Sequence, residues 1–213
     1  SEMCIRDRFY GDLDNNNQLE VVVAHFAPEM GNYVPDRNYS SVLPAMPSLR
    51  MRIPDNRKYG NSNVFQIWGP KLRRLDSLQT TTLAHAIFLN EGGSFEHREL
   101  PQEAQLAPAF HVSVADLDGD GHEDLFLSQN FFSYPLEYSR SDAGRSIWLS
   151  GDGEGGFKAV PGHKSGLIVH GEQRGAAVSD FDRDGRVDVA VSQNGATTKL
   201  FRNTLAQPGL RVR

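Results

Sequence analysis

The sequence predicts an all-β protein made of about three four-stranded antiparallel units, and three observations lead to this prediction. An acidic nine-residue pattern, D-x-[DN]-x-[DN]-[GN]-x-x-[DE], occurs at residues 12–20, 116–124 and 180–188. Each copy is followed by an apolar, β-branched run that is typical of a strand. The 20 Gly and 11 Pro among 213 residues indicate many turns. Because four-stranded units that succeed one another along a chain are typical of propeller blades, we expect a partial β-propeller.

Composition and charge narrow the classes of function. The chain is 38% hydrophobic and 23% charged, which is typical of a globular protein. No apolar run approaches the ~18 residues that a membrane-spanning helix needs. The net charge of −5 disfavours an electrostatic nucleic-acid binder. We therefore expect no membrane span and no nucleic-acid partner.

The first eight residues are expected to be foreign to the protein. Residues 3–7 read MCIRD, which is similar to the translated end of a transposase sequencing adapter. We therefore expect residues 1–8 to be such a scar and not part of the native fold. The one Cys of the chain, Cys4, lies inside this scar and says nothing about redox compartment.

Each unit is expected to run strand, metal loop, strand, strand, turn, strand. This order predicts blade regions at residues 9–104, 105–170 and 171–207. The second strand after each loop is expected at residues 86–90, 146–150 and 199–203. Gly-rich turns follow two of these strands, at residues 91–95 and 151–157.

The first blade region holds a long insertion, which we place at residues 26–83. Its six prolines argue against regular structure through much of it. It carries eight basic and four acidic residues in a chain that is acidic overall. It could bind an anionic partner, but an ordinary solvated insertion is the favoured interpretation.

The nine-residue pattern has the chemistry of a calcium loop. Oxygen ligands at positions 1, 3 and 5 of a tight loop point at a common centre, position 7 can add a backbone carbonyl, and position 9 adds a carboxylate. Ca²⁺ takes about 6–8 such oxygens. We expect about three Ca²⁺ ions, one per loop, with the first loop weaker because its fifth position is a neutral Asn and its ninth is the longer Glu. The expected ligands are Asp12, Asp14, Asn16, Gln18 and Glu20; Asp116, Asp118, Asp120, His122 and Asp124; and Asp180, Asp182, Asp184, Arg186 and Asp188.

These loops differ from EF-hands. An EF-hand has a Glu at position 12 and helical flanks, whereas position 12 here is Val23, Leu127 or Val191. The flanking runs predict strands instead. Position 6 should need a positive φ, which Gly or Asn supplies most easily. The alternative is a solvated acidic turn without metal, but three copies of such like-charged groups favour a cation.

The loops and the strands after them resemble FG-GAP or VCBS repeats, the calcium-binding propeller blades also found in integrin α-subunit heads. Residues 171–203 look like the last blade of bacterial secreted propellers of the cartilage-acidic-protein type. Residues 208–213 look like the opening strand of the ASPIC/UnbV domain that follows in that family. The resemblance implies the carboxylate ligands named above together with Asn16, and an extracellular, cell-surface or periplasmic location. Because closed propellers have about 4–8 blades, we expect the chain to be part of a longer protein at both ends.

The function we expect is a calcium-stabilised extracellular binding or adhesion scaffold without catalysis, whose ligand is a protein or a glycan. No GxSxG or P-loop motif occurs, and the seven His lack metal-site spacing. Two alternatives stay open: the propeller part of a polysaccharide lyase or hydrolase, and a binding module that serves a separate catalytic domain. Aromatic side chains at residues 131–138 could stack on sugar rings, although packing between blades is the favoured role.

Overall fold

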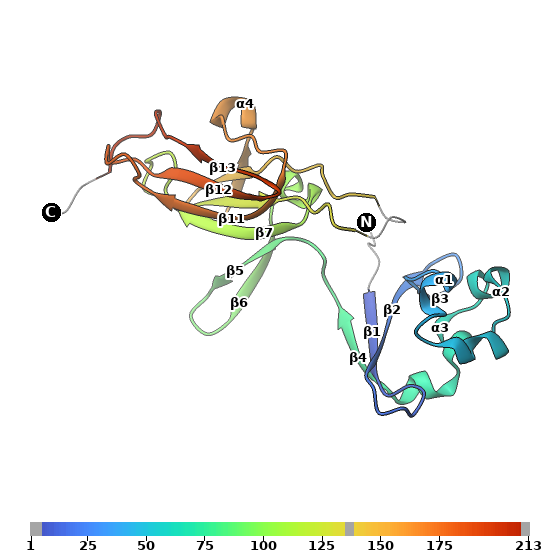
Figure 1. The fold of residues 1–213 in the computed structure, drawn as a ribbon. Coiled ribbons are helices and arrows are strands. Elements are labelled where there is room, and N and C mark those ends of the chain that lie inside the picture. Colours follow the sequence, from blue (N-terminus) through green and yellow to red (C-terminus); the bar gives the residue numbers. More distant parts are fainter. Residues whose placement is uncertain (1–5, 135–138, 210–213) are drawn as a thin grey trace. The chain divides into compact units, whose positions relative to one another are not determined.

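The computed structural model describes residues 6–134 and 139–209 (Figure 1). The chain divides into two compact units, Ser1–Leu83 and Ala84–Arg213. Most of the expected adapter scar, the expected opening strand of a following domain and part of the aromatic loop fall on residues 1–5, 210–213 and 135–138, which lie outside the described residues.

The first unit contains a four-stranded antiparallel sheet with the order β3-β2-β1-β4. Its strands are β1 (Arg6–Gly11), β2 (Glu20–Ala27), β3 (Asn32–Pro35) and β4 (Asp76–Thr80). The acidic loop at residues 12–20 joins β1 to β2, so it links two paired strands as predicted. The segment expected as an insertion supplies both edge strands of this sheet.

The rest of that segment folds into short helices, so the expectation of little regular structure is wrong here. Pro47 and Pro70 lie in the first turn of two of them, where the fixed φ of proline suits the helix and no N–H is missed. Side chains of these helices pack with Phe9 of β1 and Val22 of β2 in one hydrophobic core. The helices are α1 (Tyr39–Val42), η1 (Pro47–Met51), α2 (Asn56–Gly60), α3 (Val64–Trp68) and η2 (Pro70–Arg74).

The second unit contains the four-stranded antiparallel sheet β10-β9-β8-β7, which is the arrangement predicted for residues 105–170. Its strands are β7 (Ala109–Ala115), β8 (Asp124–Gln129), β9 (Ile147–Gly151) and β10 (Phe157–Val160). Another sheet has the order β11-β12-β13, with β11 (Glu172–Ser179), β12 (Asp188–Asn194) and β13 (Ala196–Phe201). Among the described residues this sheet has three strands rather than the four expected of a unit.

The predicted strand at residues 86–90 pairs differently from expectation. As β5 (Ala86–Asn90) it forms a separate hairpin with β6 (Phe95–Glu99) in the second unit, instead of joining the sheet of the first acidic loop. The reason is that β3 pairs with the edge of β2 that does not face β1, and β5 was expected to pair at this edge. Over residues 6–134 and 139–209 the fold is therefore all-β, with antiparallel sheets of four, four, three and two strands and a few short helices.

Strand β8 is the centre of the second unit and is buried along its whole length. Phe126 packs with Val189 and Val191 of β12, so the two larger sheets of this unit share a core, and Figure 1 shows β11 beside β7. Leu125 and Leu127 face the other side and pack in a second cluster. That cluster includes Ala104 of η3 (Gln102–Leu106) and is flanked by Ile87 of β5; the last helix is α4 (Gly162–Ser165).

Candidate metal centres

Each acidic loop brings three carboxylates together. They come from positions 1, 3 and 9 of the pattern, and in each loop one ligand atom of every member lies within 4.8 Å of the others. Each group therefore offers a converging set of anionic oxygens that could hold a metal ion. The three groups are Asp12, Asp14 and Glu20; Asp116, Asp118 and Asp124; and Asp180, Asp182 and Asp188.

The three loops share one backbone conformation. Position 6 has a positive φ in all of them, at Asn17, Gly121 and Gly185, as the sequence predicted. Position 4 is also left-handed in every loop, which the sequence analysis missed. The residues there are Asn15, Gly119 and Arg183, and the Asn and Gly were the available signal.

This backbone turns amide groups toward the position-1 carboxylate. Asp116 Oδ2 accepts a hydrogen bond from Gly121 N at 3.0 Å. Asp180 accepts the same bond from Gly185 at 3.0 Å, and Asp12 accepts it from Asn17 at 2.9 Å. The position-1 side chain is thus oriented before any ion binds.

The position-9 carboxylate ties the loop to a third strand in the second unit. Asp124 accepts from Leu117 N and from Gly151 N at the end of β9, both at 2.9 Å. Asp188 accepts from Phe181 N at 2.9 Å and from Asn203 N, two residues after β13, at 2.8 Å. Both aspartates are buried. Each therefore joins its loop to the strand that follows in the sheet.

Position 9 of the first loop has fewer partners. Glu20 is half-buried, and the described structure gives its carboxylate one amide partner, Leu13 N at 2.7 Å. No bond to a third strand corresponds to those of Asp124 and Asp188 among the described residues. The first loop is therefore attached to its sheet less firmly than the other two.

Positions 5 and 7 make a local contact with each other in all three loops. The side-chain oxygens of Asn16, Asp120 and Asp184 accept from the backbone N–H of position 7 at 2.7, 2.8 and 2.9 Å. Asp184 is also held by the Arg186 guanidinium at 2.7 Å. The position-7 residues are Gln18, His122 and Arg186, and their carbonyl groups as metal ligands stay a prediction.

The carboxylates of the first and second loops differ in their electrostatics. Burial, and then the neighbouring charge of Asp124, raise the pKa of Asp118. By contrast, the pKa of Asp12 is lowered, chiefly by the hydrogen bond from Asn17 N, and Lys71 adds to this effect. A cation between Asp118 and Asp124 would relieve the repulsion between these two carboxylates.

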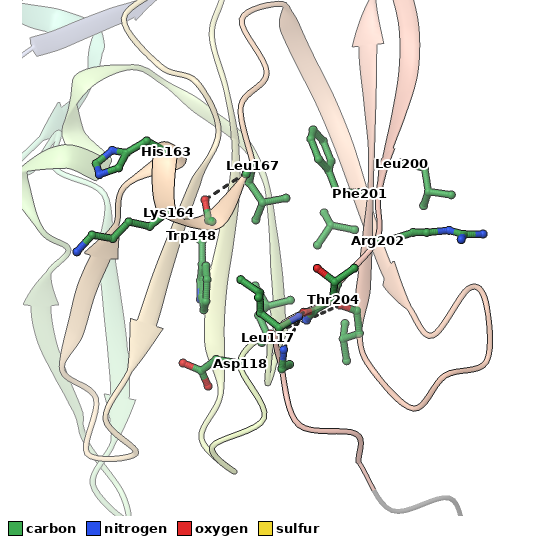
Figure 2. A pocket seen from close by; sticks show the side chains of 17 residues that line it. Leu117, Asp118, Trp148, His163, Lys164, Leu167, Leu200, Phe201, Arg202 and Thr204 are labelled. Carbon is green, nitrogen blue, oxygen red and sulfur yellow. Dashed lines mark hydrogen bonds between the residues drawn. The ribbon is translucent and has the colours of Figure 1, made fainter.

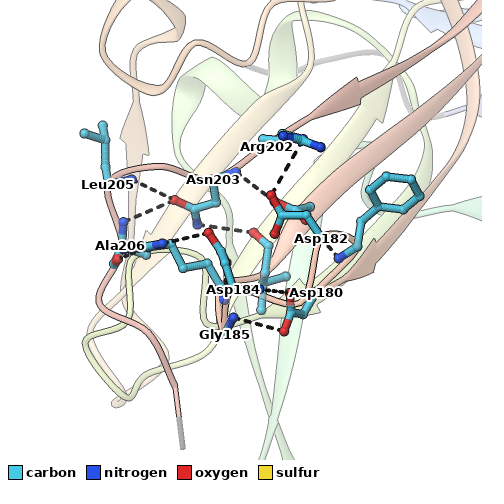
Figure 3. A network of polar contacts seen from close by, with 12 residues as sticks. Asp180, Asp182, Asp184, Gly185, Arg202, Asn203, Leu205 and Ala206 are labelled. Atoms are coloured by element: carbon cyan, nitrogen blue, oxygen red, sulfur yellow. Dashed lines mark hydrogen bonds and ion pairs between the residues drawn. The ribbon is translucent and has the colours of Figure 1, made fainter. Parts of the chain in front are cut away.

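Figure 3 shows the polar network around the third loop. Arg202 Nε lies 3.7 Å from Asp182 Oδ2, and Arg186 Nε donates to the carbonyl oxygen of Ala206 at 2.6 Å. Asn203 lies at the centre of the network. Asn203 and Gly151 could not be identified from the sequence, because their contacts with the loops depend on strand pairing rather than on the nine-residue pattern.

One tryptophan lies near an acidic loop in each unit. A cavity of about 540 Å³ in the second unit is lined by Trp148, Phe201 and Asp118 of the second loop (Figure 2). A cavity of about 530 Å³ in the first unit is lined by Trp68 and by Asp14 of the first loop. Each indole can therefore report on its neighbouring loop.

The described part of the aromatic loop packs within the second unit. The ring of Phe131 lies 5.6 Å from that of Phe110, and the Arg174 guanidinium lies 4.2 Å from the Phe110 ring centroid. Arg174 is also paired with the buried Glu172 at 2.5 Å. Packing therefore accounts for Phe131.

Comparison with known proteins returned no matching family model and no matching curated protein. Among the described residues, no helix is both long and apolar enough to cross a membrane.

Proposed function

We propose that this chain is a calcium-stabilised, non-catalytic binding or adhesion scaffold of the extracellular kind, with its sheets acting as β-propeller blades. The observation that carries the proposal is the environment of Asp124 and Asp188. Each is a buried carboxylate that contacts amides of two separate segments and lies within 4.8 Å of two further carboxylates. An ion there would hold a loop and a following strand together.

The donor set favours calcium over a transition metal. The converging side chains are all carboxylates, and hard cations prefer such oxygen ligands. Ca²⁺ also tolerates irregular geometry and accepts backbone carbonyls and water at its remaining positions, whereas Mg²⁺ demands a near-ideal octahedron. We therefore assign calcium to the loops, with the third and second loops as the stronger sites.

An extracellular, cell-surface or periplasmic location fits this role. Calcium sites of extracellular modules typically have dissociation constants of about 10⁻⁴–10⁻³ M. Such sites are filled where calcium is abundant, so the ions act as permanent parts of the structure rather than as signals. The ligand of the scaffold would be a protein or a glycan held on the surface of the blades.

The blade assignment is supported by how the sheets of the second unit pack. The second-unit sheet of four strands is a meander, and its buried strand β8 shares a core with β12 of the next sheet. The acidic loop joins the first and second strands in both of these sheets. Repetition of one loop at one place in successive packed sheets is what we expect of repeated blades, since a propeller is built by radial repetition of one sheet unit.

Calorimetric titration of the metal-free chain with CaCl₂ tests this function. We expect binding at two to three sites, with dissociation constants of about 10⁻⁴–10⁻³ M and weaker binding of Mg²⁺. The variant Asp188→Asn should lose one site, while the surface variant Asp142→Asn should keep them all. Absence of binding at a calcium concentration of about 10 mM, far above that range, would overturn the proposal.

A further inference from the structure

Asn203 lies where the two acidic loops of the second unit meet. Its backbone N–H donates to Asp188 Oδ1 at 2.8 Å, and its side-chain Nδ2 donates to the carbonyl oxygen of Leu117 at 2.7 Å. Asp188 belongs to the third loop, and Leu117 is the second residue of the second loop. One side chain and its own peptide group therefore contact both loops.

The contact continues to the carboxylate cluster of the second loop. The backbone N–H of Leu117 donates to Asp124 Oδ2 at 2.9 Å. Three hydrogen bonds thus connect Asp124 with Asp188, through Leu117 and Asn203. Asp124 is fully buried and Asp188 is 2% exposed, so water competes little with these bonds.

The chain after Asn203 is held by the same residue and by the third loop. Asn203 Oδ1 accepts from Ala206 N at 3.1 Å, and the carbonyl oxygen of Ala206 accepts from Arg186 Nε at 2.6 Å. These bonds are part of the network in Figure 3. The conformation of residues 203–206 therefore depends on Asn203.

The next residues lie against the tips of both loops. Gly209 N donates to the carbonyl oxygen of Gly185 at 2.7 Å. Gln207 lies so close to Gly119 that a Cβ on Gly119 would be 2.8 Å from the Gln207 carbonyl oxygen. Residues 203–209 thus span the second and third loops, and ordering either loop helps to order this segment.

We propose that Asn203 is a positioning residue that couples the two metal centres, so that an ion in either loop strengthens binding in the other. This inference rests on the proposed function. An ion in one loop orders that loop and, through Asn203, the segment 203–209. The other loop is then already partly ordered, so a second ion binds there at a smaller cost in conformational entropy. The coupling is therefore positive.

The matching residue in the neighbouring sheet cannot play this part. Gly151 donates its N–H to Asp124 as Asn203 does to Asp188, but it has no side chain to reach another loop. A Cβ at Gly151 would collide with the carbonyl oxygen of Glu123. Of these two matching residues, only Asn203, which follows the sheet β11-β12-β13, can connect the two loops through its side chain.

Terbium luminescence can test the coupling between the two sites. Tb³⁺ replaces Ca²⁺ in oxygen cages, and Trp148 lines a cavity with Asp118 of the second loop and Val187 of the third, so excitation of this indole reports on both loops of the second unit. The full chain would carry Trp68→Phe and Asp14→Asn, which remove the signal and the site of the first unit. Disabling the third loop with Asp182→Asn should then weaken terbium binding at the second loop by about five-fold or more.

The role of Asn203 is tested by adding Asn203→Ala, which keeps the N–H to Asp188 and removes the bond to Leu117. In that background Asp182→Asn should no longer change the affinity of the second loop. The neighbouring exposed variant Thr204→Ala should leave the coupling intact.

Three outcomes separate the possibilities. Equal terbium affinity with and without Asp182→Asn would overturn the coupling while leaving the proposed function standing, and this comparison needs no change at Asn203. Coupling that persists in folded Asn203→Ala would overturn the role of this residue. Absence of any sensitised signal in the starting chain would count against the metal centres themselves.

Discussion

The acidic loop at residues 12–20 and the two loops at residues 116–124 and 180–188 have the same backbone but different surroundings. In the first, Asp12 and Asp14 are exposed and Glu20 has one amide partner among the described residues. In the other two, the ninth carboxylate is buried and is bonded to two segments. The local sequence makes the loop, whereas its neighbours determine how much an ion in it can stabilise.

The largest difference should appear when metal is removed. Each filled site stabilises the fold by about 1.4–2.7 kcal/mol when calcium is ~10–100 times its dissociation constant. EDTA should therefore lower the melting temperature of the second unit, with two sites, by on the order of 10 °C, and that of the first unit, with one weaker site, by less. Trp148 fluorescence in Trp68→Phe reports the second unit, and Trp68 fluorescence in Trp148→Phe reports the first.

Calcium added back should restore both melting curves. Equal shifts of the melting temperature in the two units would contradict the difference between the loops. A melting temperature of the second unit that EDTA leaves unchanged would refute the metal centres of that unit.

Replacing the carboxylate at the ninth position should give the next largest difference between the loops in the free energy of unfolding. Asp124→Ala leaves the amides of Leu117 and Gly151 without their partner, at about 1–3 kcal/mol each. We expect a total loss of about 3 kcal/mol or more, against about 1 kcal/mol for Glu20→Ala, which frees a single amide. Urea unfolding in calcium measures both, with Asp188→Ala as a matched variant that should behave like Asp124→Ala. Similar losses for Glu20→Ala and Asp124→Ala would contradict this ranking.

Replacing Asp118, at the third position of the second loop, should change stability in opposite directions with calcium and with EDTA. In calcium, Asp118→Asn and Asp182→Asn should each destabilise by about 1–2 kcal/mol through weaker ion binding, and more than Asp14→Asn. In EDTA, Asp118→Asn should instead stabilise the second unit, since it removes a charge that burial and Asp124 disfavour. Unfolding curves of the three variants in both buffers decide this, and a loss of stability on Asp118→Asn in EDTA would refute it.

In the metal-free protein, Asp12 of the first loop and Asp118 of the second loop should change the free energy of unfolding in opposite directions as pH rises. The folded pKa of Asp118 lies above its ordinary value of 3.8, so this group makes stability fall as pH rises from 3.8 through the folded pKa. The folded pKa of Asp12 is lowered, so its contribution is present above 3.8 and is lost as pH falls through the folded pKa. Comparing acid titrations of Asp118→Asn and Asp12→Asn in EDTA with the parent chain separates the two trends, which should be opposite.

The smallest expected effect concerns position 4. Arg183 has a φ of 65°, a region that costs an L-residue about 1–2 kcal/mol, whereas glycine adopts it freely. Arg183→Gly should therefore stabilise by about 0.5–1 kcal/mol, while Asn15→Gly should change little because Asn tolerates this region. Gly119→Ala should destabilise, because its φ is 79° and its Cβ would press on Gln207. Urea midpoints that move equally in Arg183→Gly and Asn15→Gly would argue against strain at Arg183.

Much of the candidate site was predictable because it lies within nine consecutive residues. The spacing of carboxylates, the positive φ at Gly121 and Gly185, and the strands on either side all follow from local geometry. The convergence of positions 1, 3 and 9 followed from the same pattern. The side-chain oxygen of the fifth position accepts a hydrogen bond from the amide two residues later, and its role as a metal ligand stays a prediction.

The pairing of distant strands was less predictable. The helices between β3 and β4 formed despite four prolines, because prolines such as Pro47 and Pro70 fall where a helix begins. The strand at residues 86–90 did not pair with β2, because β3 had taken that edge. Both results depend on which segments compete for one sheet edge, and no short pattern encodes that competition.

The sequence by itself determined that the chain is all-β, that three acidic loops join paired strands, and which carboxylates converge in each. Only the tertiary structure decided that Asp124 and Asp188 are buried, and that Asn203 contacts Leu117, 86 residues earlier in the chain. The physical reason is range: the loop conformation is set by neighbouring residues through φ and local hydrogen bonds. Burial and the bridge between loops arise when separate sheets pack together.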